Sequence, residues 1–427
     1  MVRLRCLLVV LVCLATACAG PPSVMTALPE AQGCPVLPPD SIWNTSIEDL
    51  PVHPRSVEWV ASIGNDEPAH ADFGSGIFDG GPIGIPYVVV PGDQERVPIS
   101  FDFDQESDPG PYPIPANAPI EGGPDADGDR HILVVDADAC VLYEVYQAYP
   151  DGSGGWTAGS GAIFDLNSNE LRTDTWTSAD AAGLPILPGL VRPEEVAAGH
   201  IDHALRVTAP RTDRSYVWPA RHQAGATDDP TLPPMGARLR LSSSINPSDF
   251  PAQVQPIVVA LQTYGAFLAD NGSPWFISGV PDESWNNDDL RALADITGSD
   301  WEVVDSSGLQ LAPDSGAARQ SPGQATDPPL REGGRLSGPT RIDTAISISR
   351  AQFPDGAPTV YLASADVFVD AVAGGVLTDG PILLVPACGS LPDAVALEIT
   401  RLDPGRVLAL GGEAAICESM LDQARAA

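Results

Sequence analysis

Acidic residues and histidines in the middle of the chain are of the types that polysaccharide-cleaving sites use. Glu106 lies in FDFDQESDPG, Asp202 and His203 lie in GHIDHALRV, and His222 follows a tryptophan and an arginine in YVWPARHQA. Glycoside hydrolysis needs one carboxyl group as an acid and a second as a base or nucleophile. β-Elimination instead needs a histidine or tyrosine base and an arginine that neutralises the carboxylate of the substrate. The four candidates fit both reactions, and the structural alternative for Asp202 is an ion pair with Arg206 on a strand face.

Three aspartates of PDADGDRH, namely Asp125, Asp127 and Asp129, have the spacing of a calcium-binding loop. The segment lacks the distal glutamate of an EF-hand, so a polar turn is the alternative to a Ca²⁺ site. The chain has no Gly-x-Ser-x-Gly, His-Glu-x-x-His, P-loop or dinucleotide-binding motif. The sequence therefore indicates no cofactor beyond Ca²⁺ in this one loop.

Short apolar runs separated by Pro, Gly and Asp recur over residues 36–310, as in GIPYVVVP, RHILVVDAD and CVLYEVYQAY. Short strands with closely spaced turns predict a central mainly-β sandwich of jelly-roll kind, built of antiparallel strands with a few helices. Helices are expected in PRSVEWVASIG, in NNDDLRALADI and, as one long helix, in PAQVQPIVVALQTYGAFLADNG. We expect GHIDHALRV to be a strand that presents His200, Asp202 and Arg206 on one face.

The N-terminal segment MVRLRCLLVVLVCLATACAG has two arginines, a short apolar run and then small residues. This pattern predicts a secretory signal peptide over residues 1–18, since the run is too short for a mature transmembrane helix. Its end resembles a bacterial lipobox, which implies that Cys18 is lipidated; secretion without lipid is the alternative. A Pro-rich tether is expected over residues 19–35, and a Pro/Gly/Ser-rich stretch predicts a linker over residues 311–333.

Four cysteines remain once the signal peptide and Cys18 are set aside. An even number of cysteines in an exported chain indicates two disulfides. The segments in which they lie predict the pairs Cys34–Cys140 and Cys388–Cys417. A metal site is the weaker alternative, because no Cys-x-x-Cys spacing occurs.

The last segment, residues 334–427, alternates strand and helix patterns, with TVYLAS, PILLVPA and RVLALGG as strands. This alternation predicts a small three-layer α/β module with a parallel sheet. The segment resembles the cell wall-binding repeat type 2 family in five landmarks that occur in order. The landmark residues are Arg335, Gly338, Arg341, Thr344 and Ala345 at the start, Asp370 in the middle, Pro381, Ile382, Leu383 and Leu384 in the second strand, and Gly411 and Gly412 after the third.

The resemblance implies non-covalent attachment to a cell-wall polysaccharide and no catalysis by this module. Members of the family usually carry three tandem repeats, whereas this chain carries one. A homotrimer formed through the module, the use of divalent cations and weak binding are therefore all open. From its residues alone, Pro381–Leu384 reads as a buried strand.

The chain of 427 residues carries 22 basic residues, all of them arginine, and 57 acidic ones, for a net charge of −35. This excess argues against nucleic acid and anionic lipid as direct partners, so a membrane is expected as a partner only through a lipid anchor. The stretches SNELRTDTWTSADAAGLPILPGLVRPEEV and DNGSPWFISG resemble a domain of uncharacterised secreted bacterial proteins, which implies no activity.

We therefore expect an exported, lipid-anchored protein of the cell envelope that binds wall polysaccharide and displays a carbohydrate-interacting β-domain. The alternative is a wall-associated polysaccharide-degrading enzyme, a glycoside hydrolase or lyase, in the central domain.

Overall fold

The computed structural model describes residues 28–319, 340–353, 356–365, 380–402, 404–413 and 415–426. These residues form two compact units. The boundary between the central unit and the C-terminal unit lies between Ala325 and Thr326. The predicted signal peptide with Cys18, and residues 320–333 of the predicted linker, lie outside the described residues. No helix in the described part of the chain is long and apolar enough to cross a bilayer.

The α-helices of the central unit are short: α1 (Ser56–Ile63), α2 (Pro193–Ala198), α3 (Gln255–Thr263) and α4 (Asn287–Leu290). Helices α1 and α4 occur where the sequence predicts them. The single long helix predicted to run through α3 is wrong, because α3 ends at Thr263 and a strand begins at Ala266. Gly265 separates them with a φ of +64°, a left-handed conformation that ends a helix and favours glycine.

The largest sheet of the central unit has six strands in the order β1-β14-β11-β13-β12-β15. Their bounds are His70–Asp72 (β1), Phe276–Ser278 (β14), Leu205–Ala209 (β11), Ala266–Asn271 (β13), Arg238–Leu241 (β12) and Trp301–Val304 (β15). The pairs β1–β14 and β11–β13 are parallel, whereas the other three pairs are antiparallel.

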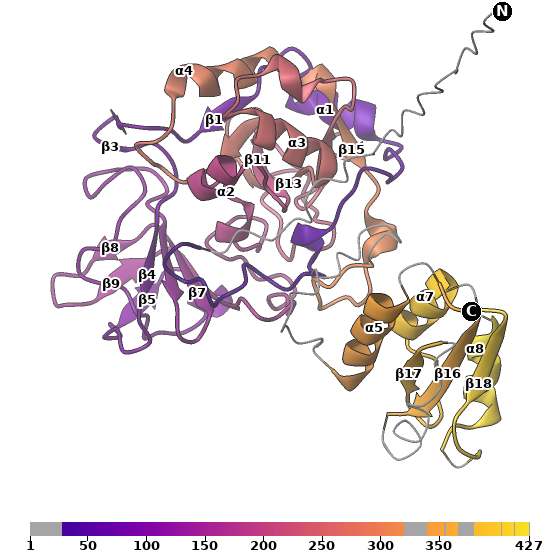
Figure 1. Cartoon of the computed structure of the whole chain (residues 1–427). Coiled ribbons are helices and arrows are strands. Elements are labelled where there is room, and N and C mark those ends of the chain that lie inside the picture. The colour runs from indigo at the N-terminus through magenta and orange to yellow at the C-terminus, as the bar shows by residue number, and fades with distance from the viewer. Residues whose placement is uncertain are drawn as a thin grey trace, which may run out of the picture. The chain divides into compact units, whose positions relative to one another are not determined.

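A second sheet has four strands in the order β10-β7-β6-β4, and β4–β6 is its parallel pair. Its strands are β10 (Ser160–Asp165), β7 (Val141–Tyr146), β6 (Ile132–Asp136) and β4 (Tyr87–Val90). Two smaller sheets join β5 (Ile99–Phe101), β9 (Trp156–Ala158) and β8 (Tyr149–Pro150), and β2 (Ile77–Phe78) with β3 (Gly81–Pro82). Figure 1 shows β4, β5, β7, β8 and β9 in the indigo-to-purple part of the central unit.

The mainly-β architecture with few helices is confirmed, but its strands do not all run antiparallel as predicted for a jelly roll. Four strand pairs in the described part of the central unit are parallel, namely β1–β14, β11–β13, β4–β6 and β5–β9. A two-residue turn forces neighbouring strands to be antiparallel, whereas a connection of many residues allows either direction. The strands β11 and β13 are separated by more than fifty residues that include β12 and α3, so their direction could not be read from local turn signals.

Strand β6 is buried on both faces. The residue directly before it is His131, and the burial of the strand fixes its position. Leu133 and Val135 pack into the larger core with the six-stranded sheet, whereas Ile132 and Val134 pack into a second core with Trp156 of β9. A strand covered on both sides reads as a continuous apolar run, as ILVV does here.

The C-terminal unit has a parallel three-stranded sheet in the order β17-β16-β18. Its strands are β16 (Thr359–Ser364), β17 (Ile382–Val385) and β18 (Arg406–Ala409), and its helices are α5 (Arg341–Gln352), α7 (Asp393–Leu402) and α8 (Glu418–Ala426). The three strands lie where the sequence predicts them. These elements appear in orange to yellow in Figure 1.

Both predicted disulfides are present. Cys34 bonds Cys140 with their Cα atoms 5.2 Å apart, and Cys388 bonds Cys417 at a Cα separation of 5.4 Å. Each bond lies within one of the two units.

Candidate functional site

The described wall-binding landmarks build the frame of the C-terminal unit. Arg335, Gly338 and Asp370 lie outside the described residues. Helix α5 begins at Arg341 and carries Thr344 and Ala345. The landmark Pro381, Ile382, Leu383 and Leu384 is strand β17 and the residue before it, and Leu383 is fully buried.

Gly411 and Gly412 follow β18 at its carboxyl end. Gly411 has a φ of +93°, and the carbonyl oxygen of Gly412 accepts hydrogen bonds from the N–H groups of Ala415 and Ile416. The two glycines therefore turn the chain toward α8.

A buried glutamate joins two helices of the C-terminal unit. The carboxylate of Glu398 on α7 is fully buried and accepts hydrogen bonds from Ser349 Oγ (2.6 Å), Arg350 Nε (3.1 Å) and Arg401 Nη2 (2.7 Å). Burial raises the pKa of Glu398, but these donors outweigh it and the pKa is lowered. Sequence patterns did not single out Glu398, because it occupies an ordinary position in an amphipathic helix.

In the central unit, Glu106 and His222 approach each other. Glu106 ends a short 3₁₀ turn, and its Oε2 atom lies 3.9 Å from His222 Nε2 and 3.3 Å from the backbone nitrogen of Thr177. The other ring nitrogen of His222 lies 2.9 Å from the carbonyl oxygen of Ala181. This is a loose pair at the protein surface, with the Glu106 side chain 39% and the His222 side chain 28% exposed.

Asp202 and His203 lie elsewhere and bind different partners. The strand predicted over GHIDHALRV begins only at Leu205, so the predicted alternation of faces does not apply to residues 200–204. Asp202 pairs with His200 at 2.9 Å. His203 is buried between the carbonyl oxygen of Ala204 (2.8 Å) and Glu195 Oε2 (3.1 Å). No interaction of these residues joins them to Glu106 or His222, so the four candidates do not form one site.

The loop predicted to bind calcium is hydrogen-bonded to a buried arginine. The buried guanidinium of Arg130 donates hydrogen bonds to the carbonyl oxygens of Pro124 (2.9 Å) and Ala126 (2.8 Å), so both oxygens already accept a hydrogen bond from a cation of the protein itself. Asp125 and Asp127 are exposed and belong to no group of three potential metal ligands among the described residues. Asp129 instead lies with Glu121 and His131, whose ligand atoms are within 4.8 Å of one another.

A group of charged side chains in the central unit surrounds Arg206. We call it the Arg206 cluster, and its members are Asp72, Glu121, Asp129, His131, Asp180, Arg206 and Asp270.

Three neighbouring strands align part of this cluster. Asp72 of β1 pairs with Ser278 of β14, and the pairing of Val207 with Ile277 places Arg206 opposite Ser278. Arg206 Nη1 donates to Ser278 Oγ at 2.7 Å, and its Nη2 donates to Asp180 Oδ1 at 2.8 Å.

A β-bulge brings Asp270 onto the same face of the sheet as Arg206. Phe267 pairs with Arg206, but the register shifts after Val207, so that Thr208 pairs with Asp270. Residues 267 and 270 of a regular strand face opposite sides, because side chains alternate. The extra residue removes that difference, and bulges characteristically redirect a side chain in this way.

His131 is a buried cation in this cluster. Its Nδ1 atom lies 2.6 Å from Glu121 Oε2, and its Nε2 atom lies 3.0 Å from the carbonyl oxygen of Ala179. Both nitrogens must carry a hydrogen to satisfy two oxygen acceptors, which makes the ring an imidazolium rather than a metal ligand. Burial lowers the pKa of His131, but Glu121 raises it more, to about 9.

The carboxyl groups of the cluster fall into two classes. Burial raises the pKa of Glu121, but His131 outweighs it and the pKa is lowered. Burial and the neighbouring Asp180 raise the pKa of Asp270 to about 7, although Arg206 lowers it. Burial and Glu121 likewise raise the pKa of Asp72. Glu121 is therefore ionised at neutral pH, whereas Asp270 is close to half protonated.

Sequence reasoning named only Arg206 and Asp129 among the members of this cluster. Asp72 and Asp180 were missed because they stand in DEPAHADFG and TWTSADAAG, which carry no recognisable motif, and Asp270 was missed because it ends an ordinary apolar run. A polar residue at the end of an apolar strand, as in AFLADN, is the signal that could have pointed to Asp270.

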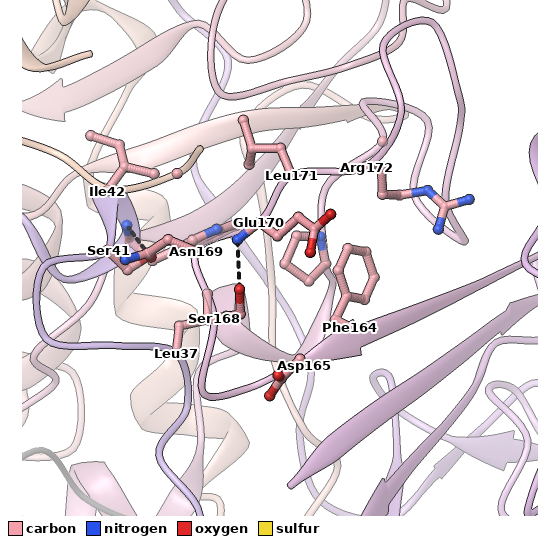
Figure 2. A pocket seen from close by; sticks show the side chains of 14 residues that line it. Leu37, Ser41, Ile42, Phe164, Asp165, Ser168, Asn169, Glu170, Leu171 and Arg172 are labelled. Carbon is pink, nitrogen blue, oxygen red and sulfur yellow. Dashed lines mark hydrogen bonds between the residues drawn. The ribbon is translucent and has the colours of Figure 1, made fainter. Parts of the chain in front are cut away.

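A small pocket lies apart from these residues. Figure 2 shows it between the loop around Ser168, Asn169 and Glu170 and the segment that contains Ser41 and Ile42. Arg172 lines it, but its guanidinium is paired with Asp108 and donates to the carbonyl oxygen of Glu106 at 2.8 Å. The positive charge of Arg172 is therefore already paired, and the carboxylates of Asp165 and Glu170 also line the pocket.

The family comparison concerns the C-terminal unit alone. Residues 335–421 match the family described as cell wall binding domain 2 (CWB2). Among solved structures, Cwp6 from Clostridium difficile is similar at 28% identity over 21% of this chain, with a TM-score of 0.20. The match spans 15% of the length of Cwp6. No curated protein matches the chain.

The predicted resemblance is thus confirmed for the segment that carries the landmarks. The match begins at Arg335, the first of them, and extends beyond Gly412, the last. Over residues 335–421, this chain is similar to cell wall binding domain 2, and that similarity supports binding to the cell wall.

Proposed function

We propose that this protein is exported, is anchored to the membrane by lipid on Cys18, and attaches non-covalently to a cell-wall polysaccharide through residues 334–427. Its central unit would be displayed between the two attachments and would bind carbohydrate. The observation that carries the proposal is the match of residues 335–421 to cell wall binding domain 2.

Charge and sequence order support this arrangement. A net charge of −35 disfavours direct contact with anionic lipid, so an attachment to the membrane requires a covalent lipid. The predicted tether follows Cys18, and the predicted linker precedes the module, which gives each attachment its own spacer.

Co-sedimentation with purified cell walls tests the proposal. A protein of residues 19–427 is expected to sediment with the walls, and a protein of residues 19–330 is expected to stay in solution. Retention of the shorter protein on the walls would place wall binding in the central unit and contradict the proposal. Mass spectrometry of the protein from its native membrane tests the lipid on Cys18.

We also propose that three chains assemble through their C-terminal modules. Similar proteins carry three repeats in one chain, and a homotrimer supplies the same number from chains that carry one. Light scattering on residues 19–427 should give three times the mass of one chain; a mass of one chain would contradict this assembly.

A further inference from the structure

We propose that the pocket beside Asn169 binds a primary ammonium group, carried by an amino sugar whose nitrogen has no acetyl group. The inference rests on the proposed function in that the central unit meets carbohydrate, and it names the class of sugar. The pocket lies between the loop of residues 168–170 and the segment that contains Ser41 and Ile42 (Figure 2).

Unpaired negative charge is the first feature of this pocket. The carboxylates of Asp165 and Glu170 line it together with one cation, Arg172. That cation is paired with Asp108, which is not a lining residue. In the described part of the chain, neither Asp165 nor Glu170 forms an ion pair. The pocket therefore attracts a positively charged group and repels phosphates and uronates.

A buried acceptor without a partner is the second feature. Asn169 Nδ2 donates a hydrogen bond to Asp40 Oδ1 at 2.8 Å. Because an ionised carboxylate only accepts, this contact fixes which atom of the Asn169 amide is the nitrogen and which is the oxygen. Asn169 Oδ1 is buried and accepts no hydrogen bond from the described residues. Such an acceptor favours a ligand that donates hydrogen bonds, and an ammonium group has three donors.

The size of the pocket decides how much of a ligand enters it. Its volume is about 30 Å³, which is room for one or two water molecules. An ammonium group is close to a water molecule in size and fits, whereas a sugar ring or an N-acetyl group does not. We therefore expect the amino group alone to enter, while the sugar ring remains at the mouth of the pocket.

Apolar walls distinguish this pocket from a metal site. A Ca²⁺ ion takes about six to eight oxygen ligands. The apolar lining of the pocket includes the side chains of Leu37, Ile42, Phe164, Leu171 and Pro185. These walls offer no ligand to a bare cation, but they suit the carbon atoms next to an ammonium group. An organic cation therefore fits the pocket better than a metal ion does.

Hydrogen bonds of the backbone hold the pocket in shape. The N–H group of Gly316 donates to the carbonyl oxygen of Asn169 at 2.6 Å, and the carbonyl oxygen of Gly316 accepts from the N–H group of Ile42 at 2.8 Å. The two sides of the pocket are thus joined through Gly316, which also lines it. Ser168 Oγ accepts from the backbone nitrogen of Glu170 at 3.0 Å, as Figure 2 shows. The site is therefore formed before a ligand arrives, which reduces the ordering cost of binding.

Calorimetric titration of residues 19–427 tests the inference with methyl glucosaminide, methyl N-acetylglucosaminide and Nα-acetyl-lysine amide. The last probe offers the same ammonium group from an amino-acid side chain. We expect methyl glucosaminide to bind with a dissociation constant on the order of 1 mM, because few of its atoms enter the pocket. The N-acetylated sugar should bind at least about tenfold more weakly, since it lacks the charge and exceeds the space. Added NaCl should weaken the binding of the glucosaminide, because exposed charges are screened.

Variants separate the pocket from the general attraction of cations to a chain with a net charge of −35. Glu170→Gln and Asp165→Asn should each raise the dissociation constant of methyl glucosaminide about fivefold or more. Glu58→Gln is the matched control: it changes the net charge equally, and Glu58 pairs with Arg55 on α1 outside the pocket. It should leave the dissociation constant within about twofold. Urea unfolding followed by tryptophan fluorescence verifies that each variant is folded.

Four results would overturn the inference. The first is equal affinity for the acetylated and the unacetylated sugar. The second is equal weakening in Glu58→Gln and Glu170→Gln, which would assign the binding to net charge. The third is binding of the lysine amide without binding of the glucosaminide. The fourth is no binding of the glucosaminide by a protein that still sediments with walls, which would leave the proposed wall attachment intact.

The opposite combination separates the two proposals as well. Binding of methyl glucosaminide that is lost in Glu170→Gln, by a protein that does not sediment with walls, would support the pocket while contradicting the proposed wall attachment.

Discussion

The Nδ1 atom of His131 lies 2.6 Å from the carboxylate of Glu121, and the histidine is the buried member of the pair. The partner of its second ring nitrogen, the carbonyl oxygen of Ala179, fixes the ring in the protonated form. The central unit thus contains a buried imidazolium cation immediately before strand β6. The stability of the unit must therefore depend on pH.

We expect the free energy of unfolding of the central unit to fall as pH rises from 6.5 to 9. The pKa of His131 is raised from 6.5 to about 9, so its contribution is complete below 6.5 and is lost through pH 9. The loss should amount to a few kcal/mol at most. Urea unfolding at several pH values measures it, and His131→Gln should show a weaker dependence.

Tryptophan fluorescence isolates the central unit in such experiments. All 8 tryptophans lie between residues 43 and 301, so the C-terminal unit contributes none. A wild-type profile as flat as that of His131→Gln would contradict the imidazolium assignment.

Removal of Asp180 should leave Arg206 as an unpaired buried cation. Asp180→Asn is expected to cost roughly 3–5 kcal/mol of unfolding free energy, because a charge buried without its partner is costly. The double variant Arg206→Gln, Asp180→Asn should lose less unfolding free energy than Asp180→Asn alone. In the double variant, no guanidinium is left without its carboxylate partner. Urea unfolding followed by tryptophan fluorescence compares the variants. If the losses of unfolding free energy in the two single variants simply add in the double variant, the result would argue against an ion pair between Asp180 and Arg206.

Gly265→Ala should destabilise the central unit by roughly 1–3 kcal/mol through backbone strain. The φ of Gly265 is +64°, and a Cβ there would lie 2.1 Å from the carbonyl oxygen of Leu239. Gly308→Ala is the matched control, because nothing lies within 4 Å of its Cβ, and it should change stability by less than about 0.5 kcal/mol. Equal effects of the two changes in thermal unfolding would contradict this role of Gly265.

Glu398→Gln should unfold the C-terminal unit selectively. The buried carboxylate joins Arg350 of α5 to Arg401 of α7, and loss of its charge should cost roughly 3–5 kcal/mol. We expect wall co-sedimentation to disappear while the fluorescence-monitored unfolding of the central unit is unchanged. Glu418→Gln, at an exposed pair with Arg425, is the control and should retain wall binding.

Local patterns in the sequence were sufficient for the C-terminal unit and for both disulfides. Its strands are short apolar runs bounded by turn residues, and the cysteine pairs follow from their division between two segments. The same reasoning misread residues 266–271, because an apolar run after a helical one cannot be assigned by periodicity alone. Only the conformation of Gly265 separates the two elements.

The Arg206 cluster could not be predicted for a different reason. Asp72 and Asp270 come from strands on either side of Arg206 in the sheet order, separated by almost two hundred residues of chain. The approach of each to Arg206 depends on pairings between strands far apart in the sequence and on one bulge, neither of which leaves a local signal. Sequence reasoning favoured other residues instead, because their types and those of their neighbours suggested polysaccharide cleavage. These residues are Glu106, Asp202, His203 and His222.

The disulfide between Cys34 and Cys140 determines how the central unit bears mechanical force. Cys140 lies in the turn between β6 and β7, two strands flanked in their sheet by β4 and β10. A pull on the N-terminal end of the chain therefore passes at Cys34 into this hairpin through a covalent bond. The residues that follow, including the buried Ile42 and Trp43, bear none of that tension. While the bond is intact, traction on the N-terminus cannot pull the chain that follows Cys34 out of the core; reduction of the bond would expose Ile42 and Trp43 to the load directly.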